Sequence, residues 1–136
     1  MDYKFIDDLT SDVMFEAYGK TLVELLENAA TAMFSVICDI KNVSPLQEIK
    51  INISEDSEDA ILHRWLCELL TQSDIHNMFF SKFEASINGQ YGISGIAQGE
   101  PISPKKSGTV VKGVTYYGFK LEKTNNGYKA RVAIDI

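Results

Sequence analysis

The sequence predicts a single α+β domain over residues 1–136, with two layers: two helices packed on one face of a largely antiparallel β-sheet. Two stretches repeat apolar residues at helical spacing, and several others alternate apolar with polar residues or are rich in β-branched and aromatic side chains. Asn-Gly pairs at 88–89 and 126–127 are the turns expected between hairpin strands. A chain of 136 residues is long enough to bury one sizeable core.

The N-terminal part of the chain is expected to form two short strands beside an acidic segment. The strands are predicted over residues 3–6 and 13–18, and Asp7, Asp8 and Asp12 fall between them. Aspartate is a poor strand residue, and a carboxylate near a core is costly unless another group pairs with it. This acidic segment is therefore the first candidate for a functional role.

Two helices are predicted from their apolar stripes. The first begins at Thr21, where Glu24 completes a capping box. The second follows the acidic run SEDSED, in which Asp56 or Ser57 is expected to cap the helix, because acidic residues favour its N-terminal end. The inward-facing residues are Leu22, Leu25, Leu26, Ala29, Ala30, Met33, Phe34 and Ile37 in the first helix, and Ile61, Leu62, Trp65, Leu66, Leu69 and Leu70 in the second.

The remaining segments are predicted to be strands. Residues 47–54 alternate, with three isoleucines on one face and polar residues on the other. Gly92, Gly95 and Gly99 are expected to mark bulges or bends in a later strand, because glycine weakens a strand interior. From residue 78 onward the strand-like segments are MFFSKFEASING, QYGISGIAQGE, GTVVKGVTYYGFKLEK and GYKARVAIDI.

Composition and charge restrict the class of partner. The formal net charge of -6 argues against strong or broad direct nucleic-acid binding, although it leaves room for one small basic patch or a protein partner. The charged start MDYKFIDD lacks the apolar region of a secretory signal, and no apolar run approaches the length of a membrane span. Cys38 and Cys67 are expected to be reduced thiols. We therefore expect a cytoplasmic protein that does not contact membranes.

The candidate chemistry is that of carboxylate oxygens. The sequence contains no P-loop, no GxGxxG segment before a helix, and no Cys/His cluster with zinc spacing. Asp135 shares a strand face with Arg131, so the simple interpretation is a solvated or paired carboxylate. If the first and last strands are neighbours, however, Asp12 and Asp135 converge, and the chain-end carboxylate at Ile136 adds negative charge. Such a group needs a proton or a hard cation, namely calcium, magnesium or manganese.

Lys112 is a second candidate. It lies in TVVKGVTYYGF, where its neighbours are otherwise apolar or aromatic. It is either a solvent-facing strand lysine or a contact for a phosphate or a carboxylate. Lys105 and Lys106 form a small basic spot in the preceding loop.

Several segments of the chain match the motifs of one known family. LTSDVMFEAYGKTLVELLENAATAMF resembles an opening HTADV segment followed by an A-x-G-x-T-L-x-E helix. DAILHRWLCELL is similar to a WLxELL helix, and AQGEPIS to a GE-containing strand end. GTVVKGVTYYGFKL resembles a VKA(I/V)TYH segment, and IDI resembles the typical C-terminus. In this order, and over nearly the whole chain, these segments resemble the archease family.

The resemblance implies a function and a set of site residues. It implies a cytosolic accessory protein that activates an RtcB-class RNA ligase in tRNA splicing and RNA repair, promoting the ligase's guanylylation and multiple turnover without being an enzyme itself. The metal ligands that it implies are Asp12, Asp39 and Asp135, with Lys112 as a partner or phosphate contact. The implied ion is divalent, calcium first, with magnesium or manganese as alternatives. Asp8 and Ile136 are possible supporting residues.

The chain departs from the family pattern at its histidines. Leu9 stands in place of the HTADV histidine, and Tyr117 in place of the TYH histidine. The histidine that usually precedes the VKA segment has no counterpart, and Lys105 or Lys106 occupies that loop. The implied site therefore lacks imidazole, which favours calcium or magnesium over softer ions.

Two other functions are left open by the sequence. A small metal-dependent phosphohydrolase would use the carboxylates and a divalent ion to activate water. A chaperone-like or adaptor domain would need no metal at all.

Overall fold

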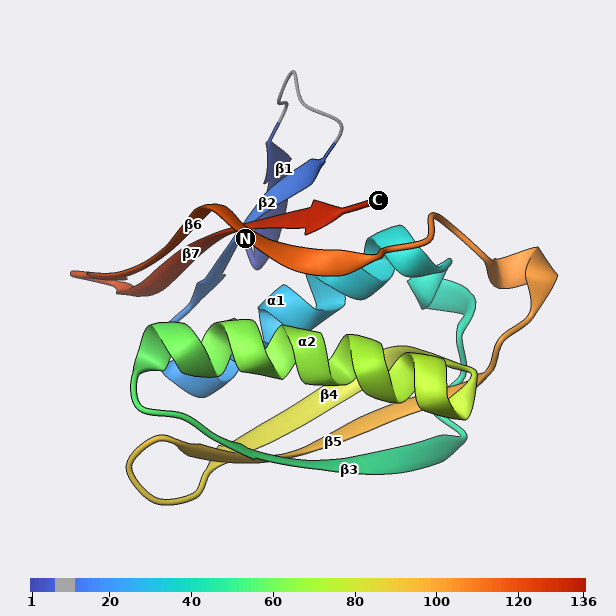
Figure 1. Cartoon of the computed structure of the whole chain (residues 1–136), viewed down its shortest axis with the longest axis horizontal. Helices are drawn as coiled ribbons and strands as arrows, with labels where there is room; N and C mark the ends of the chain where they lie inside the picture. Colours follow the sequence, from blue (N-terminus) through green and yellow to red (C-terminus); the bar gives the residue numbers. More distant parts are fainter. Residues whose placement is uncertain (7–11) are drawn as a thin grey trace.

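In the computed structural model of this chain, residues 1–6 and 12–136 are described (Figure 1). The described part contains two α-helices, two short 3-10 helices and seven strands. Their order and bounds are β1 Tyr3–Ile6, β2 Val13–Gly19, α1 Leu22–Ile37, η1 Ile40–Asn42, β3 Gln47–Ser54, α2 Glu58–His76, β4 Met78–Ile87, β5 Gly92–Pro101, η2 Pro104–Lys106, β6 Gly113–Thr124 and β7 Gly127–Asp135. No helix in these residues is long and apolar enough to cross a membrane.

The strands form two antiparallel sheets. One has the order β1-β2-β7-β6 and the other has the order β3-β5-β4. Both helices lie between the sheets in Figure 1, and each contacts both: α1 packs on β2 and β4, and α2 packs on β6 and β3. The predicted α+β class, the two helices and the antiparallel pairing are confirmed. The strands divide between two sheets, however, so the helices form a central layer instead of lying on one face of one sheet.

The burial of α1 explains this arrangement. Ala29, Ala30 and Ala32 are all fully buried, although consecutive residues of a helix point in different directions. A helix that is buried over more than one stripe needs apolar cover on more than one side. Small alanine side chains let the two sheets approach α1 closely.

The predicted helix starts are confirmed. The Thr21 hydroxyl accepts a hydrogen bond from the main-chain N–H of Glu24 at 3.1 Å. Ser57, not Asp56, caps α2, accepting from the main-chain N–H of Ala60 at 3.2 Å. α2 ends at His76, and its C-cap residue Asn77 has a φ of 51°, in the left-handed region.

Trp65 connects the layers at the centre of the core. Its side chain is fully buried, and its indole N–H donates to the carbonyl oxygen of Leu26 at 2.9 Å, which joins α2 to α1. Gly95 of β5 faces the indole, and a Cβ atom there would lie 2.6 Å from two ring carbons. β5 runs from Gly92 to Pro101, and its pairing with β4 shifts register where Phe80 pairs with Gly99 and Lys82 with Gln98, so the expected irregularity occurs at Gly99. Gly95 is therefore required for space against Trp65 and does not mark a bend.

The segment before β6 differs from the predicted strand. β6 begins only at Gly113. Before it, the main-chain N–H groups of Gly108 and Thr109 donate to the carbonyl oxygens of Ile37 and Val36, each at 2.8 Å. This connection therefore satisfies carbonyl groups at the C-terminal end of α1, and it leads from that end to the sheet.

Candidate functional site

Asp12 and Asp135 meet at one end of the four-stranded sheet. In the β2–β7 register Val13 pairs with Ile134. Continued by one residue, this register sets Asp12 opposite Asp135, the last residue of β7. The first and last long strands are thus neighbours, which was the condition for these two carboxylates to converge. Asp12 is half-buried and Asp135 is exposed.

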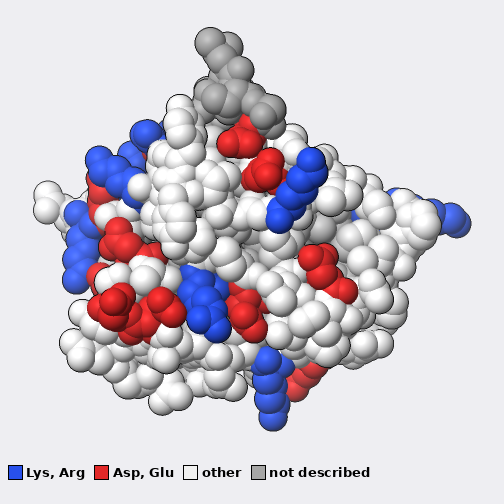
Figure 2. Space-filling model, viewed as in Figure 1, with Lys and Arg blue, Asp and Glu red and all other residues white. Residues whose placement is uncertain are grey.

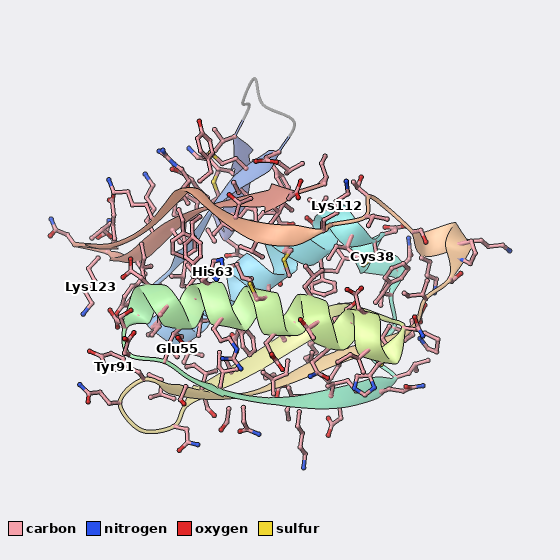
Figure 3. All side chains as sticks on the ribbon, viewed as in Figure 1. Cys38, Glu55, His63, Tyr91, Lys112 and Lys123 are labelled. Atoms are coloured by element: carbon pink, nitrogen blue, oxygen red, sulfur yellow. The ribbon has the colours of Figure 1, made fainter. Side chains whose placement is uncertain are left out.

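Lys112 reaches the same end of the sheet from the other side of β7. Its main-chain N–H donates to the carbonyl oxygen of Asp135 at 2.7 Å, and the next residue, Gly113, pairs with Asp135 in the β6–β7 register. The lysine is exposed. Figure 3 shows Lys112 and Cys38 on the same side of α2. Three predicted site residues therefore come from adjacent strand ends.

Asp39 approaches from the C-terminal end of α1. Its main-chain N–H donates to the carbonyl oxygen of Lys106 at 2.8 Å, and its carboxylate accepts a hydrogen bond from the Asn42 side-chain amide at 2.6 Å. Lys106, which accepts the hydrogen bond from Asp39, begins the segment that leads to Lys112. Asp39 is therefore linked to the sheet end by a single segment, residues 106–112.

Asp12 and Asp135 are opposed, but a third ligand does not join this pair among the described residues. Within residues 1–6 and 12–136, no group of three or more His, Cys, Asp or Glu side chains is placed to hold a metal ion. Asp7 and Asp8 fall outside the described residues. Ile136 lies at the same sheet end and is 36% exposed. The site therefore consists of Asp12, Asp135, Lys112 and Ile136, and Asp39 is connected to it through its hydrogen bond to Lys106 and the segment 106–112.

Glu100, at the end of β5, is a site residue that the sequence did not single out. Its side chain is buried, and it accepts hydrogen bonds from the ammonium group of Lys106 and from the main-chain N–H of Ser44 at 3.0 Å. The hydrogen bond from Lys106, followed by that from Ser44, lowers the pKa of Glu100 below its ordinary value of 4.5. Glu100 thus holds two segments near Asp39: the loop at Ser44, which follows η1, and η2, where the carbonyl oxygen of Lys106 accepts the hydrogen bond from Asp39. Only the resemblance of AQGEPIS to a family motif pointed toward it.

Lys106 is consequently not a free cation in the loop. Its ammonium group is bonded to Glu100 and its side chain is 31% exposed. It cannot substitute for a missing histidine without breaking that contact. Lys105 is exposed.

Both cysteine thiols have a pKa above the ordinary value. Cys38 is buried and donates to the carbonyl oxygen of Phe34 at 3.2 Å. Burial, with the neighbouring charges of Asp39 and Glu100, raises the pKa of Cys38 to about 12. Burial also raises the pKa of the half-buried Cys67. Both are free cysteines, and a raised pKa disfavours the nucleophilic thiolate form of each.

The His63 imidazole holds α2 to β6. Its Nε2 atom lies 3.0 Å from the carbonyl oxygen of Val114, so Nε2 carries the proton and donates it. The ring stacks on Tyr116 with centroids 3.9 Å apart. Figure 3 shows His63 on α2. With Nε2 bonded and its ring face covered, this histidine packs the layers together.

Replacing Glu100 with glutamine should make stability less dependent on pH. A carboxyl group whose pKa is lower in the folded state stabilises the fold above its unfolded pKa, and this contribution is lost as the pH falls from 4.5 through the folded pKa. Glu100→Gln should therefore unfold at lower urea concentration than the native protein at pH 7. The difference should shrink as the pH falls below about 4.5.

Urea unfolding followed by circular dichroism at pH 7 and pH 4 measures both effects. Glu48→Gln, on an exposed position of β3, is the matched control and should behave like the native protein. Equal urea midpoints for Glu100→Gln and the control at pH 7 would contradict the role of Glu100.

Comparison with known proteins agrees with the fold and with the motif resemblance. Residues 3–136 match the model of the archease protein family (MTH1598/TM1083). Protein archease of Methanosarcina mazei is 38% identical over 140 residues, which covers 98% of this chain and 95% of the relative. Protein archease of Archaeoglobus fulgidus is 34% identical over 138 residues, which covers all of both chains.

Two solved structures share the fold. The solution structure of Methanobacterium thermoautotrophicum protein 1598 has a TM-score of 0.88 at 35% identity and covers 98% of both chains. The crystal structure of a Thermotoga maritima protein described as an archease and possible chaperone has a TM-score of 0.71 at 17% identity, covering 96% of this chain and 95% of that one. With the family model matched from residue 3 to residue 136, this chain belongs to the archease family.

Proposed function

We propose that this chain is a cytoplasmic accessory protein that activates an RtcB-class RNA ligase in tRNA splicing and RNA repair. It would promote the ligase's guanylylation and multiple turnover and would not join RNA itself. Membership of the archease family supports this proposal, together with the motif residues Asp12, Asp39, Asp135 and Lys112. The observation that carries it is the β2–β7 register, because this pairing sets Asp12 opposite Asp135 and next to Lys112.

We further propose that Asp12, Asp39 and Asp135 hold a divalent cation. Their donors are all carboxylate oxygens, which suit calcium first and magnesium or manganese as alternatives. The fit is chemical more than geometric, because no three carboxylates converge in the described residues. Asp39 would have to exchange its hydrogen bond with Asn42 for the ion. Bound there, the ion would place positive charge at a sheet end that carries two opposed aspartates.

Lys112 would act beside this group. Its main chain is tied to β7 while its side chain is exposed, so its ammonium group is available at a position set by the sheet. An ammonium group held in this way can bind a phosphate or a carboxylate of the ligase. Asp12, Asp135 and Lys112 would together present both signs of charge to the partner.

The test is multiple-turnover RNA ligation by an RtcB-class ligase from the same source. GTP and a divalent metal are supplied, and this protein is added at a substoichiometric level. We expect more ligated product per ligase molecule and faster guanylylation when the protein is present. An unchanged yield over the whole time course would contradict the proposal. Release of phosphate from model phosphodiesters by this protein alone would instead favour the phosphohydrolase.

A metal-independent chaperone or adaptor is the second candidate. The description "possible chaperone" given to the Thermotoga maritima protein favours it. It differs from the first candidate in one measurable respect. Chelation of divalent ions would then change neither the melting temperature of the protein nor its binding to the ligase.

A further inference from the structure

The outer face of the four-stranded sheet carries a cluster of basic residues around one buried carboxylate. Glu16 of β2 lies on the opposite side of the strand from the core residues Phe15 and Ala17, and only 6% of its side chain is exposed. Its carboxylate is 3.4 Å from the ammonium group of Lys4, 3.4 Å from that of Lys129 and 3.8 Å from the Arg131 guanidinium. We call this group, completed by Lys120 and Glu122, the basic cluster.

The basic cluster has more positive charge than it can neutralise. Lys120 pairs with Glu122 at 2.6 Å, but Glu16 faces three cations with one charge. Four cations and two carboxylates leave a net charge of +2 on a chain whose net charge is -6. Figure 2 shows Lys and Arg atoms gathered beside the β6–β7 hairpin. The positive charge is thus local, on a protein that is acidic elsewhere.

The cations are held in place. Burial acts to raise the pKa of Glu16. The hydrogen bond that the Tyr18 hydroxyl donates to it at 2.9 Å and the charge of Lys129 act in the opposite direction. Together they outweigh burial, so the pKa of Glu16 lies below the ordinary value. Glu16 is therefore ionised at neutral pH and fixes the ends of three flexible side chains. Ordering them in the free protein reduces the entropy that an anionic ligand would otherwise have to remove.

The register arranges the cations in a row. Lys4 pairs with Glu16, Glu16 with Arg131, and Arg131 with Lys120, so the row crosses all four strands. Neighbouring strands are about 4.8 Å apart, so the row spans roughly 14 Å. Lys129, two residues along β7 from Arg131, widens it by about 7 Å. Such a row matches a ligand with repeated negative charges along its length.

We propose that the basic cluster binds the phosphate backbone of single-stranded RNA. Every residue of the cluster is charged, which suits a polyanion better than an apolar protein surface. A phosphate backbone needs only cations. By strand alternation Asp135 lies on the same face, four residues from Arg131 and about 13 Å away. RNA on the cluster would thus run along the sheet toward the proposed ligase-activating end.

RNA would then be a polymer that the proposed ligase activator contacts directly. The RNA-binding role rests on the basic cluster, so it can be tested separately from ligase activation. Its test is direct binding of a fluorescein-labelled single-stranded RNA to the whole protein, measured by fluorescence anisotropy at 50 mM and 200 mM salt. With four phosphate contacts, we expect affinity to fall about 50-fold between these salt concentrations, which corresponds to a log–log slope of about -2.8.

The variant Lys120→Gln/Lys129→Gln removes two contacts and keeps Arg131 beside Glu16. Its affinity should fall only about 7-fold over the same salt range, with a slope of about -1.4, and it should bind more weakly than the native protein at 50 mM. Lys41→Gln/Lys50→Gln, at exposed lysines elsewhere, changes the net charge equally and should leave the native slope unchanged. Circular dichroism confirms that each variant is folded.

Three results would overturn the proposal: no RNA binding at 50 mM salt, an equal loss of affinity in both double variants, or displacement of RNA by polyglutamate at equal charge concentration. The last result would assign the cluster to an acidic protein surface. Asp135→Ala should bind RNA at least as well as the native protein. Failure of ligase activation and failure of RNA binding can therefore be told apart.

Discussion

Replacing Asp135 with alanine should reduce stimulation of an RtcB-class ligase at least tenfold, while the protein stays folded. Asp135 is exposed at the end of β7, so its side chain contributes little to the core. The β2–β7 register sets Asp135 opposite Asp12. Loss of a metal ligand, or of a residue that supports a ligand, typically costs 10- to 100-fold in metal affinity or activity. Multiple-turnover ligation with substoichiometric protein measures the effect.

Two further variants separate the charge of Asp135 from its shape and its position. Asp135→Asn keeps the shape but loses the charge, and it should resemble the alanine variant. Asp74→Ala removes an exposed aspartate near the end of α2 and should stimulate the ligase as the native protein does. Added calcium should raise the melting temperature of the native protein and of Asp74→Ala, but not that of Asp135→Ala. Full stimulation by Asp135→Ala would show that no ion at this carboxylate is needed.

Trp65→Ala should destabilise the fold by about 4 kcal/mol, the largest single effect on stability that we expect. The substitution empties space between both helices and β5 and removes the hydrogen bond to Leu26. Gly95 cannot fill this space, because it has no side chain. We expect the melting temperature to fall by more than about 10 °C in a thermal scan followed by circular dichroism.

Trp65→Phe is the matched variant for this prediction. It keeps an aromatic ring against Gly95 but cannot donate to Leu26, so it should lose roughly half as much stability as the alanine variant. Phe5→Ala, at a side chain that is 47% exposed on β1, should have a much smaller effect than Trp65→Ala. A fall of only a few degrees in Trp65→Ala would mean that the two helices are held together mainly by other contacts.

The local structure of this chain was largely predictable. The apolar stripes and the caps at Thr21 and Ser57 identified both helices, because stripes and caps depend on residues only a few positions apart. The division of the strands between two sheets was not predictable in this way. The division depends on which strands β5 pairs with. In its pairing with β3, Ser54 lies opposite Gly92, and these two residues are 38 positions apart in the sequence.

The candidate site was predictable only in part, and for a similar reason. The acidic segment and its family motif drew attention to Asp12, Asp39 and Asp135. The neighbouring strands that bring Asp12 to Asp135 are visible only in the register. Glu100 was missed because its partners, Lys106 and the main chain of Ser44, come from two different connections. The basic cluster was missed because Lys4, Lys120, Lys129 and Arg131 come from three separate strands.

By itself, the sequence determined the helices, most of the strands, the family and the residue types of the site. These follow from the spacing of apolar side chains, from capping and from ordered motifs, all of which act over short distances along the chain. Only the tertiary structure decided that the helices lie between two sheets, that Asp12 faces Asp135, and that Glu16 gathers cations on the outer face. Those features depend on strand pairing, and pairing is set by how all the apolar faces are buried together.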